Sequence, residues 1–310
     1  MGACLGGVFS LEDAIHLVAA RARLMQELPA GAMLSVRLPA AEVEQRLQDR
    51  GLMETCSIAA INGPALCVVS GPIAAMGELQ KALENDGAMC RPLHTSHAFH
   101  SPMMAPVVEP VAQIARGIKL SAPRLPFVST VTARWIADEQ ALDPMYWALH
   151  LRRCVRFAEA VQELWRESSP VLLEIGPRAT ATTLAMQQAT DLARQIAIPS
   201  LSDTAEGGAE WKAMMRAAGQ LWAAGVSLDW REFYALQRRR KVSLPTYAFE
   251  RTRYWAERDE AMANRRATLS SEPCGAAPAI VTTPSATPSP DADATAGRRA
   301  AIVAALTKML

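Results

Sequence analysis

The eleven residues at 94–104, HTSHAFHSPMM, place three histidines at intervals of three beside an aromatic ring. The last of them, His100, is a candidate general base, because an imidazole with a pKa near ~6.5 can take a proton from a hydroxyl nucleophile and return it to a leaving thiol. Two alternatives remain open from the spacing. His94, His97 and His100 could bind a metal if the stretch were helical, although no acidic or cysteine ligand accompanies them, or they are ordinary histidines at a strand end.

The second candidate is an arginine on the first predicted helix. Ser10 with Asp13 is typical of a capping box, which predicts a helix from there to about Leu28. Its predicted buried seam consists of apolar residues at steps of four and three: Leu11, Ile15, Val18, Ala22 and Met25. Arg21 lies on the shoulder of this seam, whereas Arg23 projects further toward solvent. Arg21 is therefore the one placed to aim a charge into a cleft, and a structural ion pair is the alternative.

Composition excludes several classes of protein. Half of the 310 residues are hydrophobic, which is enough for a sizeable core. The 32 lysines and arginines nearly balance 31 acidic residues, so we expect no nucleic-acid partner. The six cysteines are scattered without a C-x-x-C pair or an apolar leader, and no apolar run is long enough to cross a bilayer. We expect a cytoplasmic protein with reduced thiols and no membrane partner.

Hydrophobic runs and turn residues predict a strand, a helix, two strands, a helix and a strand over residues 31–96. The order β-α-β-β-α-β is that of a ferredoxin-like subdomain. Strands and helices then alternate over residues 97–200, which suits an α/β layer, so the ferredoxin-like unit appears as an insertion in an α/β fold. Residues 211–237 are predicted to be largely helical. An Ala/Pro/Ser/Thr-rich linker at 257–296 is predicted to be disordered, and residues 297–310 to be the first helix of a following domain.

Six motifs occur in the order found in the acyltransferase domain of modular polyketide synthases. They are LEDAIHLVAARARLMQ, AAINGPALCVVSGP, HTSHAFHSPMM, LHLRRCVRFAEAV, LLEIGPRATATTLA and VSLPTYAFERTRYW. The chain resembles this family over residues 1–256. The resemblance implies an α/β-hydrolase-like large subdomain, incomplete at its N-terminus, made of residues 1–30 and 97–200. It also implies the ferredoxin-like small subdomain at 31–96 and a post-acyltransferase linker at 201–256, and a carrier protein is a candidate for the domain that follows.

The function implied by this resemblance is transfer of malonyl from coenzyme A onto a serine and then onto the phosphopantetheine thiol of an acyl carrier protein. No cofactor or metal is implied, and the expected partners are the carrier protein, the ketosynthase and other synthase domains. The last histidine of the family's H-A-F-H motif is the base, which assigns that role to His100. The arginine that opens R-G-x-L-M-Q grips the extender carboxylate; it falls on Arg21, with Ala22 in place of the glycine.

Four further residues take pocket roles from the resemblance. Phe99 belongs to the H-A-F-H form that accompanies malonyl, whereas Y-A-S-H accompanies methylmalonyl; a bulky ring fills the space that an α-methyl would need. Met25 and Asn62 resemble residues that line the same cleft. His150 falls where the family usually carries an asparagine whose backbone carbonyl orients the catalytic histidine.

The family's nucleophile is a serine in G-H-S-x-G, and no G-x-S-x-G occurs in the 310 residues. Cys4 is the nearest thiol, but nothing around it indicates activation by a base. We therefore expect the chain alone to be inactive in acyl transfer and poorly soluble without the preceding piece of the domain. Two other functions remain: a non-catalytic docking piece of a polyketide synthase, and a metal-dependent hydrolase built around the histidines.

Overall fold

The computed structural model describes residues 1–166, 170–202, 209–237 and 242–248. Contacts divide the chain into two units, Met1–Leu228 and Asp229–Leu310. All elements discussed below belong to the first unit except α11 (Trp230–Phe233). The linker predicted at 257–296 and the helix predicted at 297–310 lie outside the described residues.

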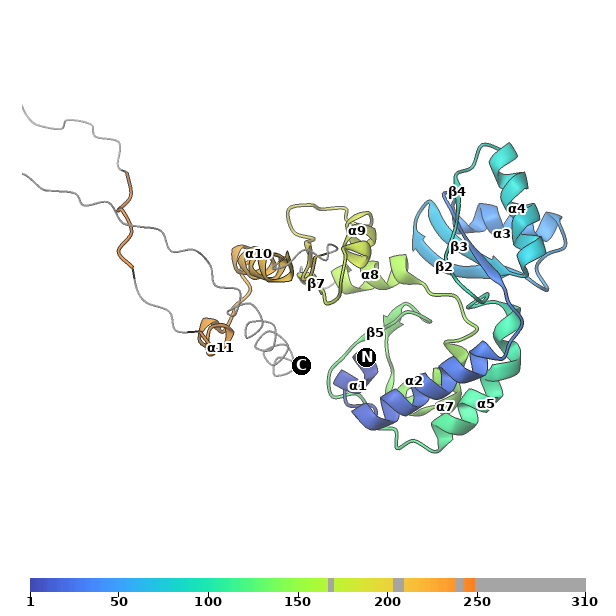
Figure 1. Cartoon of the computed structure of the whole chain (residues 1–310), viewed down its shortest axis with the longest axis horizontal. Coiled ribbons are helices and arrows are strands. Elements are labelled where there is room, and N and C mark those ends of the chain that lie inside the picture. Colours follow the sequence, from blue (N-terminus) through green and yellow to red (C-terminus); the bar gives the residue numbers. More distant parts are fainter. Residues whose placement is uncertain (167–169, 203–208, 238–241, 249–310) are drawn as a thin grey trace, which may run out of the picture. The chain divides into compact units, whose positions relative to one another are not determined.

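A four-stranded antiparallel sheet organises residues 31–96 (Figure 1). Its strands are β1 (Ala32–Val36), β2 (Ser57–Gly63), β3 (Leu66–Gly71) and β4 (Cys90–Pro92). They lie in the order β2-β3-β1-β4, and each neighbouring pair runs antiparallel. Helix α3 (Ala40–Asp49) connects β1 to β2, and α4 (Ile73–Asn85) connects β3 to β4. The element order β-α-β-β-α-β is the one that the hydrophobic runs predict.

The core of this layer lies between the sheet and its two helices. It consists of buried side chains from β1, β3, α3 and α4 and of Cys56, which directly precedes β2: Leu34, Val36, Val43, Leu47, Cys56, Cys67, Val69, Met76, Leu79 and Leu83. The helical members lie three or four residues apart because that spacing puts them on one face. Each helix is followed by a glycine in the left-handed conformation, Gly51 with φ 63° and Gly87 with φ 82°, where a side chain would be strained. This rigid layer carries the segment from β4 to His100.

Helix α2 (Leu11–Gln26) carries Arg21. Ser10 caps its N-terminus, as the sequence predicts: the Ser10 hydroxyl accepts a hydrogen bond from the backbone N–H of Asp13 at 3.0 Å. Helix α5 (Ala105–Arg116) packs against α2 and also against α7 (Pro144–Leu149) (Figure 1). The three helices thus place Arg21 and the turn after α7 in one neighbourhood.

The predicted buried seam of α2 is wrong except at Met25. Leu11, Ile15 and Val18 are 62%, 61% and 62% exposed, and Ala22 is exposed as well. The helix instead packs Leu17, Leu24 and Met25 into the cluster around α5 and α7. Two apolar stripes run along α2, and hydrophobic periodicity alone does not say which of them is covered.

Residues 97–200 contain both strands and helices, but the strands are short and the predicted alternation is incomplete, because three helices follow one another at residues 138–166. Besides α5 and α7, the elements here are η1 (Pro102–Met104), β5 (Val128–Ser129), β6 (Arg134–Trp135), α6 (Asp138–Leu142), α8 (Phe157–Arg166), β7 (Leu172–Glu174), α9 (Thr180–Met186) and β8 (Ala197–Pro199). β5 and β6 form an antiparallel pair, and β7 and β8 a parallel pair. Each of these strands is only two or three residues long.

Two further helices belong to the first unit. α1 (Gly2–Leu5) precedes α2, and α10 (Ala209–Ala223) follows β8. The helical stretch predicted over 211–237 is interrupted between α10 and α11, where Gly225 has a φ of 85°. None of the described helices combines the length and apolar character that crossing a bilayer requires.

Candidate active site

His100 has a left-handed backbone conformation, with φ 62°. This conformation is unfavourable for a residue with a Cβ atom and persists where the surroundings hold it. Here the His100 N–H donates to the Leu151 carbonyl at 3.0 Å, and the Ser57 hydroxyl donates to the His100 carbonyl at 2.8 Å. The ring Nδ1 lies 2.8 Å from the Arg153 carbonyl. Strand β2 and the turn after α7 therefore fix both the backbone and the ring of His100.

The contact with Arg153 determines which ring nitrogen of His100 can act as a base. A carbonyl oxygen only accepts, so Nδ1 carries the proton and Nε2 keeps its lone pair. Burial lowers the pKa of His100; the Arg153 carbonyl partly opposes this, the charge of Arg21 lowers the pKa further, and the His150 carbonyl raises it. The imidazole is therefore neutral at neutral pH, the form that a general base needs.

Arg21 lies on the partly covered side of α2, whereas Arg23 is exposed. Its positive charge lowers the pKa of both His100 and His150, which places the guanidinium within electrostatic range of both rings. Burial lowers the pKa of Arg21 itself. No carboxylate in the described part of the chain forms an ion pair with it. The ion-pair alternative therefore finds no partner there.

His150, at the end of α7, is a neutral aromatic neighbour of this pair. Its ring stacks on Trp147 with centroids 5.7 Å apart and meets Tyr146 edge-on at 4.8 Å. Its Nε2 is buried without a hydrogen-bond partner in the described chain. Burial, followed by the charges of Arg21 and His100, lowers the pKa of His150 to about 4. The side chain thus adds no charge near Arg21 at neutral pH.

Phe99 and Met25 pack in one apolar cluster, which also contains Met104 and Val107. Phe99 additionally packs against a second cluster, formed by Met33, Ala59 and Val68 of the sheet. Its ring therefore lies where the helices meet the sheet, directly before the base in the chain. The structure thus places Arg21, His100 and His150 in one group. Met25 and Phe99 form a second group, in the apolar cluster.

Asn62 and His97 make other contacts. The Asn62 carbonyl accepts a hydrogen bond from the Gln188 side chain at 3.1 Å, and its place in the cleft stays a prediction. His97 has both ring nitrogens engaged, Nδ1 with the Ser96 hydroxyl at 2.8 Å and Nε2 with the Leu28 carbonyl at 3.1 Å. Within the described ranges, no three His, Cys, Asp or Glu side chains gather as metal ligands. This part of the chain therefore contains no candidate metal site.

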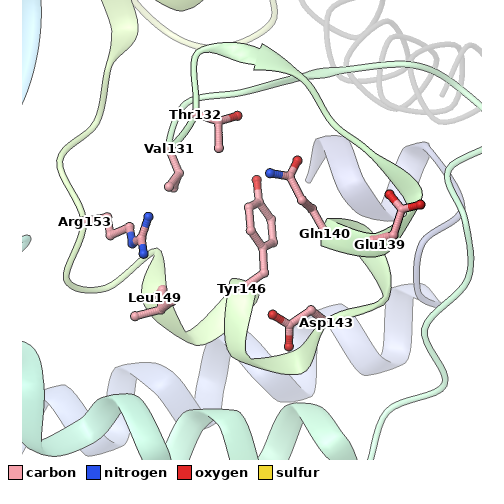
Figure 2. A pocket seen from close by; sticks show the side chains of 8 residues that line it. All are labelled: Val131, Thr132, Glu139, Gln140, Asp143, Tyr146, Leu149 and Arg153. Carbon is pink, nitrogen blue, oxygen red and sulfur yellow. The ribbon is translucent and has the colours of Figure 1, made fainter.

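Two open clefts flank the turn that holds His100, and Arg153 lines both. The first has a volume of about 350 Å³ and contains two carboxylates, an amide and a phenol (Figure 2). Its lining residues are Val131, Thr132, Glu139, Gln140, Asp143, Tyr146, Leu149 and Arg153. The Tyr146 hydroxyl is already engaged, because it donates to the Ser129 hydroxyl at 2.6 Å. The second cleft, of about 390 Å³, is formed by residues of α3 and β2 and by the stretch 152–156.

Sequence reasoning missed Ser57, Leu151 and Arg153, which hold His100 in place. Leu151 and Arg153 act through main-chain carbonyls, and Ser57 acts on a main-chain carbonyl. Residue type carries no information on such contacts. The only available indication was that Leu151 and Arg153 belong to the HLRRCVRF motif.

Comparison with known proteins supplies the family. The model of the acyl transferase domain matches residues 2–227. The chain is 37% identical over 263 residues to polyketide synthase GfsA of Streptomyces halstedii, covering 84% of this chain and 3% of that protein. It is 37% identical to the mycoketide-CoA synthase of Mycobacterium tuberculosis, covering 82% of this chain and 6% of that protein. The chain thus spans a small part of these relatives.

Solved structures agree. The acyltransferase domain from the second module of the salinomycin polyketide synthase has a TM-score of 0.70 and 38% identity, covering 80% of this chain and 57% of that one. A malonyl CoA-acyl carrier protein transacylase from Burkholderia pseudomallei has a TM-score of 0.55 and 26% identity, covering 60% of this chain and 65% of that one. The chain belongs to the acyl transferase domain family, and its relatives are modular polyketide synthases.

Proposed function

We propose that this chain serves the transfer of malonyl from coenzyme A to the phosphopantetheine thiol of an acyl carrier protein. The observation that carries the proposal is the pairing of His100 with Arg21. His100 is neutral and is held through Nδ1, and the charge of Arg21 lowers its pKa. A neutral base beside an arginine without an ion-pair partner suits a substrate that has both a reacting thioester and a free carboxylate.

The roles follow from this geometry. Nε2 of His100 takes the proton of the nucleophile during attack on the thioester and returns it to the leaving thiol. The planar guanidinium of Arg21 offers two parallel donors to the malonyl carboxylate, and an acetyl group would leave it unpaired. Phe99 and Met25 form the apolar wall. An α-methyl group is worth only ~1–3 kcal/mol in such a pocket, so the preference for malonyl over methylmalonyl is expected to be leaky.

The nucleophile has to come from elsewhere, because the 310 residues contain no G-x-S-x-G motif. We infer that these residues alone form no acyl-serine at the usual site and that transfer needs a polypeptide segment with that motif. The exposed apolar stripe of Leu11, Ile15 and Val18 is consistent with a helix that has a further partner. The second candidate function, a non-catalytic docking piece, is favoured by the same missing motif.

Fold and partners complete the proposal. The strand order β2-β3-β1-β4 with both helices contributing to one core supports a ferredoxin-like small subdomain at 31–96. We assign the remainder of residues 1–200 to an α/β-hydrolase-like large subdomain and 201–256 to a post-acyltransferase linker. The ketosynthase and other synthase domains are further proposed partners. A cytoplasmic location agrees with the free thiols of the described cysteines.

The test is transfer of isotope-labelled malonyl from coenzyme A to holo carrier protein, with and without a homologous acyltransferase segment that carries G-H-S-x-G. We expect no label on the chain alone and transfer when both pieces are present. His100→Ala should then lower transfer at least about a hundredfold, whereas His94→Ala, in the same stretch, should not. Stoichiometric labelling of the chain alone would refute the missing nucleophile. Carrier binding without transfer, unchanged by His100→Ala, would establish the docking function instead.

Arg21 is tested by substrate choice. Arg21→Gln should remove most of the preference for malonyl over acetyl thioesters, because the carboxylate loses its charged partner. Arg23→Gln makes the same change on the exposed side of α2 and should leave that preference intact. Equal preferences in the two variants would remove Arg21 from the proposed site.

A further inference from the structure

The second cleft beside His100 is rich in arginine. Its volume is about 390 Å³, and helix α3, strand β2 and the stretch 152–156 supply most of its wall. The charged side chains that line it are Arg152, Arg153, Arg156 and Glu44. The first cleft differs, because there Glu139 and Asp143 face a single arginine (Figure 2). Only the second cleft therefore has an excess of positive charge.

Two of these arginines have no acceptor of their own. Arg156 is committed, because it pairs with Glu159 and donates to the Thr132 carbonyl at 3.2 Å. Arg152 and Arg153 form no side-chain hydrogen bond or ion pair with any described residue. Burial also lowers the pKa of Arg152. A partly desolvated cation without a counter-charge is unfavourable, so the cleft is suited to an anion.

The cleft adjoins the base through two of its own residues. Ser57 lines it and donates to the His100 carbonyl at 2.8 Å. Arg153 lines it and holds Nδ1 of His100 through its carbonyl. The rest of the wall includes the apolar side chains of Ile58 and Ile61. The cleft thus suits a molecule that has both an anion and apolar parts, bound next to the residues that hold His100.

We propose that the cleft formed by α3, β2 and residues 152–156 binds the phosphate of a phosphopantetheine group, with Arg152 and Arg153 as its ligands. The inference rests on the proposed function, which requires a phosphopantetheine thiol at His100. Guanidinium groups match phosphate oxygens with paired donors, and the apolar wall suits the carbon chain of pantetheine. The group can be the arm of the carrier protein or the same portion of coenzyme A, and the two share this phosphate.

Calorimetric titration of the full chain tests the site without requiring acyl transfer. The probes are 4′-phosphopantetheine, pantetheine, coenzyme A and inorganic phosphate. We expect 4′-phosphopantetheine to bind at least about tenfold more tightly than pantetheine, since a charged hydrogen-bond pair is lost without the phosphate. Binding should weaken as salt rises. Equal affinities for the two probes would overturn the proposal, as would binding of coenzyme A alone, which would assign recognition to its other phosphates.

Three variants localise the binding. Arg152→Gln and Arg153→Gln should each weaken 4′-phosphopantetheine binding about tenfold. Arg116→Gln removes the same charge from an exposed arginine at the end of α5 and should leave it unchanged. Arg153 is exposed, so its variant keeps the test decisive if Arg152→Gln does not fold. Wild-type affinity for 4′-phosphopantetheine in both cleft variants refutes the site. Binding of 4′-phosphopantetheine by a chain that transfers no malonyl refutes only the proposed function.

Discussion

The low pKa of His150 makes the stability of the chain dependent on pH. Its folded-state pKa is about 4, against an ordinary value of 6.5. A histidine whose pKa is lowered by folding binds fewer protons in the native state than in the unfolded state. Its contribution to stability is therefore present above the unfolded pKa and is lost as the pH falls toward the folded pKa.

The magnitude follows from the two pKa values. For a His150 pKa of about 4 in the folded state and 6.5 in the unfolded state, proton linkage lowers the free energy of unfolding by about 2 kcal/mol between pH 7 and pH 5. The pKa of His100 is lowered too, mainly by burial, and adds to the loss in the same direction. The acidic groups Glu109 and Glu174 have lowered pKa values as well, so their contributions are lost only at lower pH.

Urea denaturation at several pH values measures this effect, and His150→Phe isolates it. Phenylalanine keeps a ring between Tyr146 and Trp147 but does not titrate, so the variant should lose most of the decline between pH 7 and pH 5. Tyr146→Phe is the control. It removes the hydrogen bond to Ser129 and should lower stability by about 1 kcal/mol equally at each pH. A wild-type pH slope in His150→Phe would refute a buried, neutral His150.

Four further stability predictions can be checked by the same denaturation assay. A Cβ at Gly31 would lie 2.6 Å from both the Cβ and the backbone N of Ala98, so Gly31→Ala should cost about 2 kcal/mol and displace the segment that carries His100. Gly77→Ala, in α4 with open space around it, should instead stabilise by up to about 1 kcal/mol. Leu47→Ala should cost about 2–5 kcal/mol, since this side chain is fully buried. Ser10→Ala should cost about 1 kcal/mol through loss of the α2 cap.

The small β-α-β-β-α-β layer could be predicted from the sequence because its information is local. Strand runs such as 66–71 are apolar and bounded by turn residues, and α3 and α4 repeat their apolar residues at helical spacing. Gly51 and Gly87 follow the two helices in the left-handed conformation that glycine favours. The apolar strand runs, the helical spacing of apolar residues and the glycines that follow the helices all indicate the same order of elements.

Long-range packing could not be predicted in the same way. On α2 the apolar stripe of Leu11, Ile15 and Val18 is more regular than the stripe of Leu17 and Leu24, yet the second one is covered. Which stripe packs depends on where α5 lies, and no local pattern records that. Arg21 is partly covered because it lies four residues after Leu17 and three before Leu24 on the packed stripe, whereas the seam used to predict its position is exposed.

The roles of the proposed site residues stay predictions, but the main-chain contacts that hold His100 could not have been predicted from residue types. His100, Arg21 and Phe99 belong to motifs in which residue type matters, whereas the ring of His100 is oriented by the carbonyl of Arg153. Any residue at 153 supplies that carbonyl, so substitutions there can change the charge of the cleft without releasing the base. The same reasoning applies to position 150. The backbone carbonyl at 150 raises the pKa of His100 whatever side chain the residue carries, and the His150 side chain changes only the wall beside Arg21. Variation in this motif should therefore alter what the pocket binds before it alters the orientation of the base.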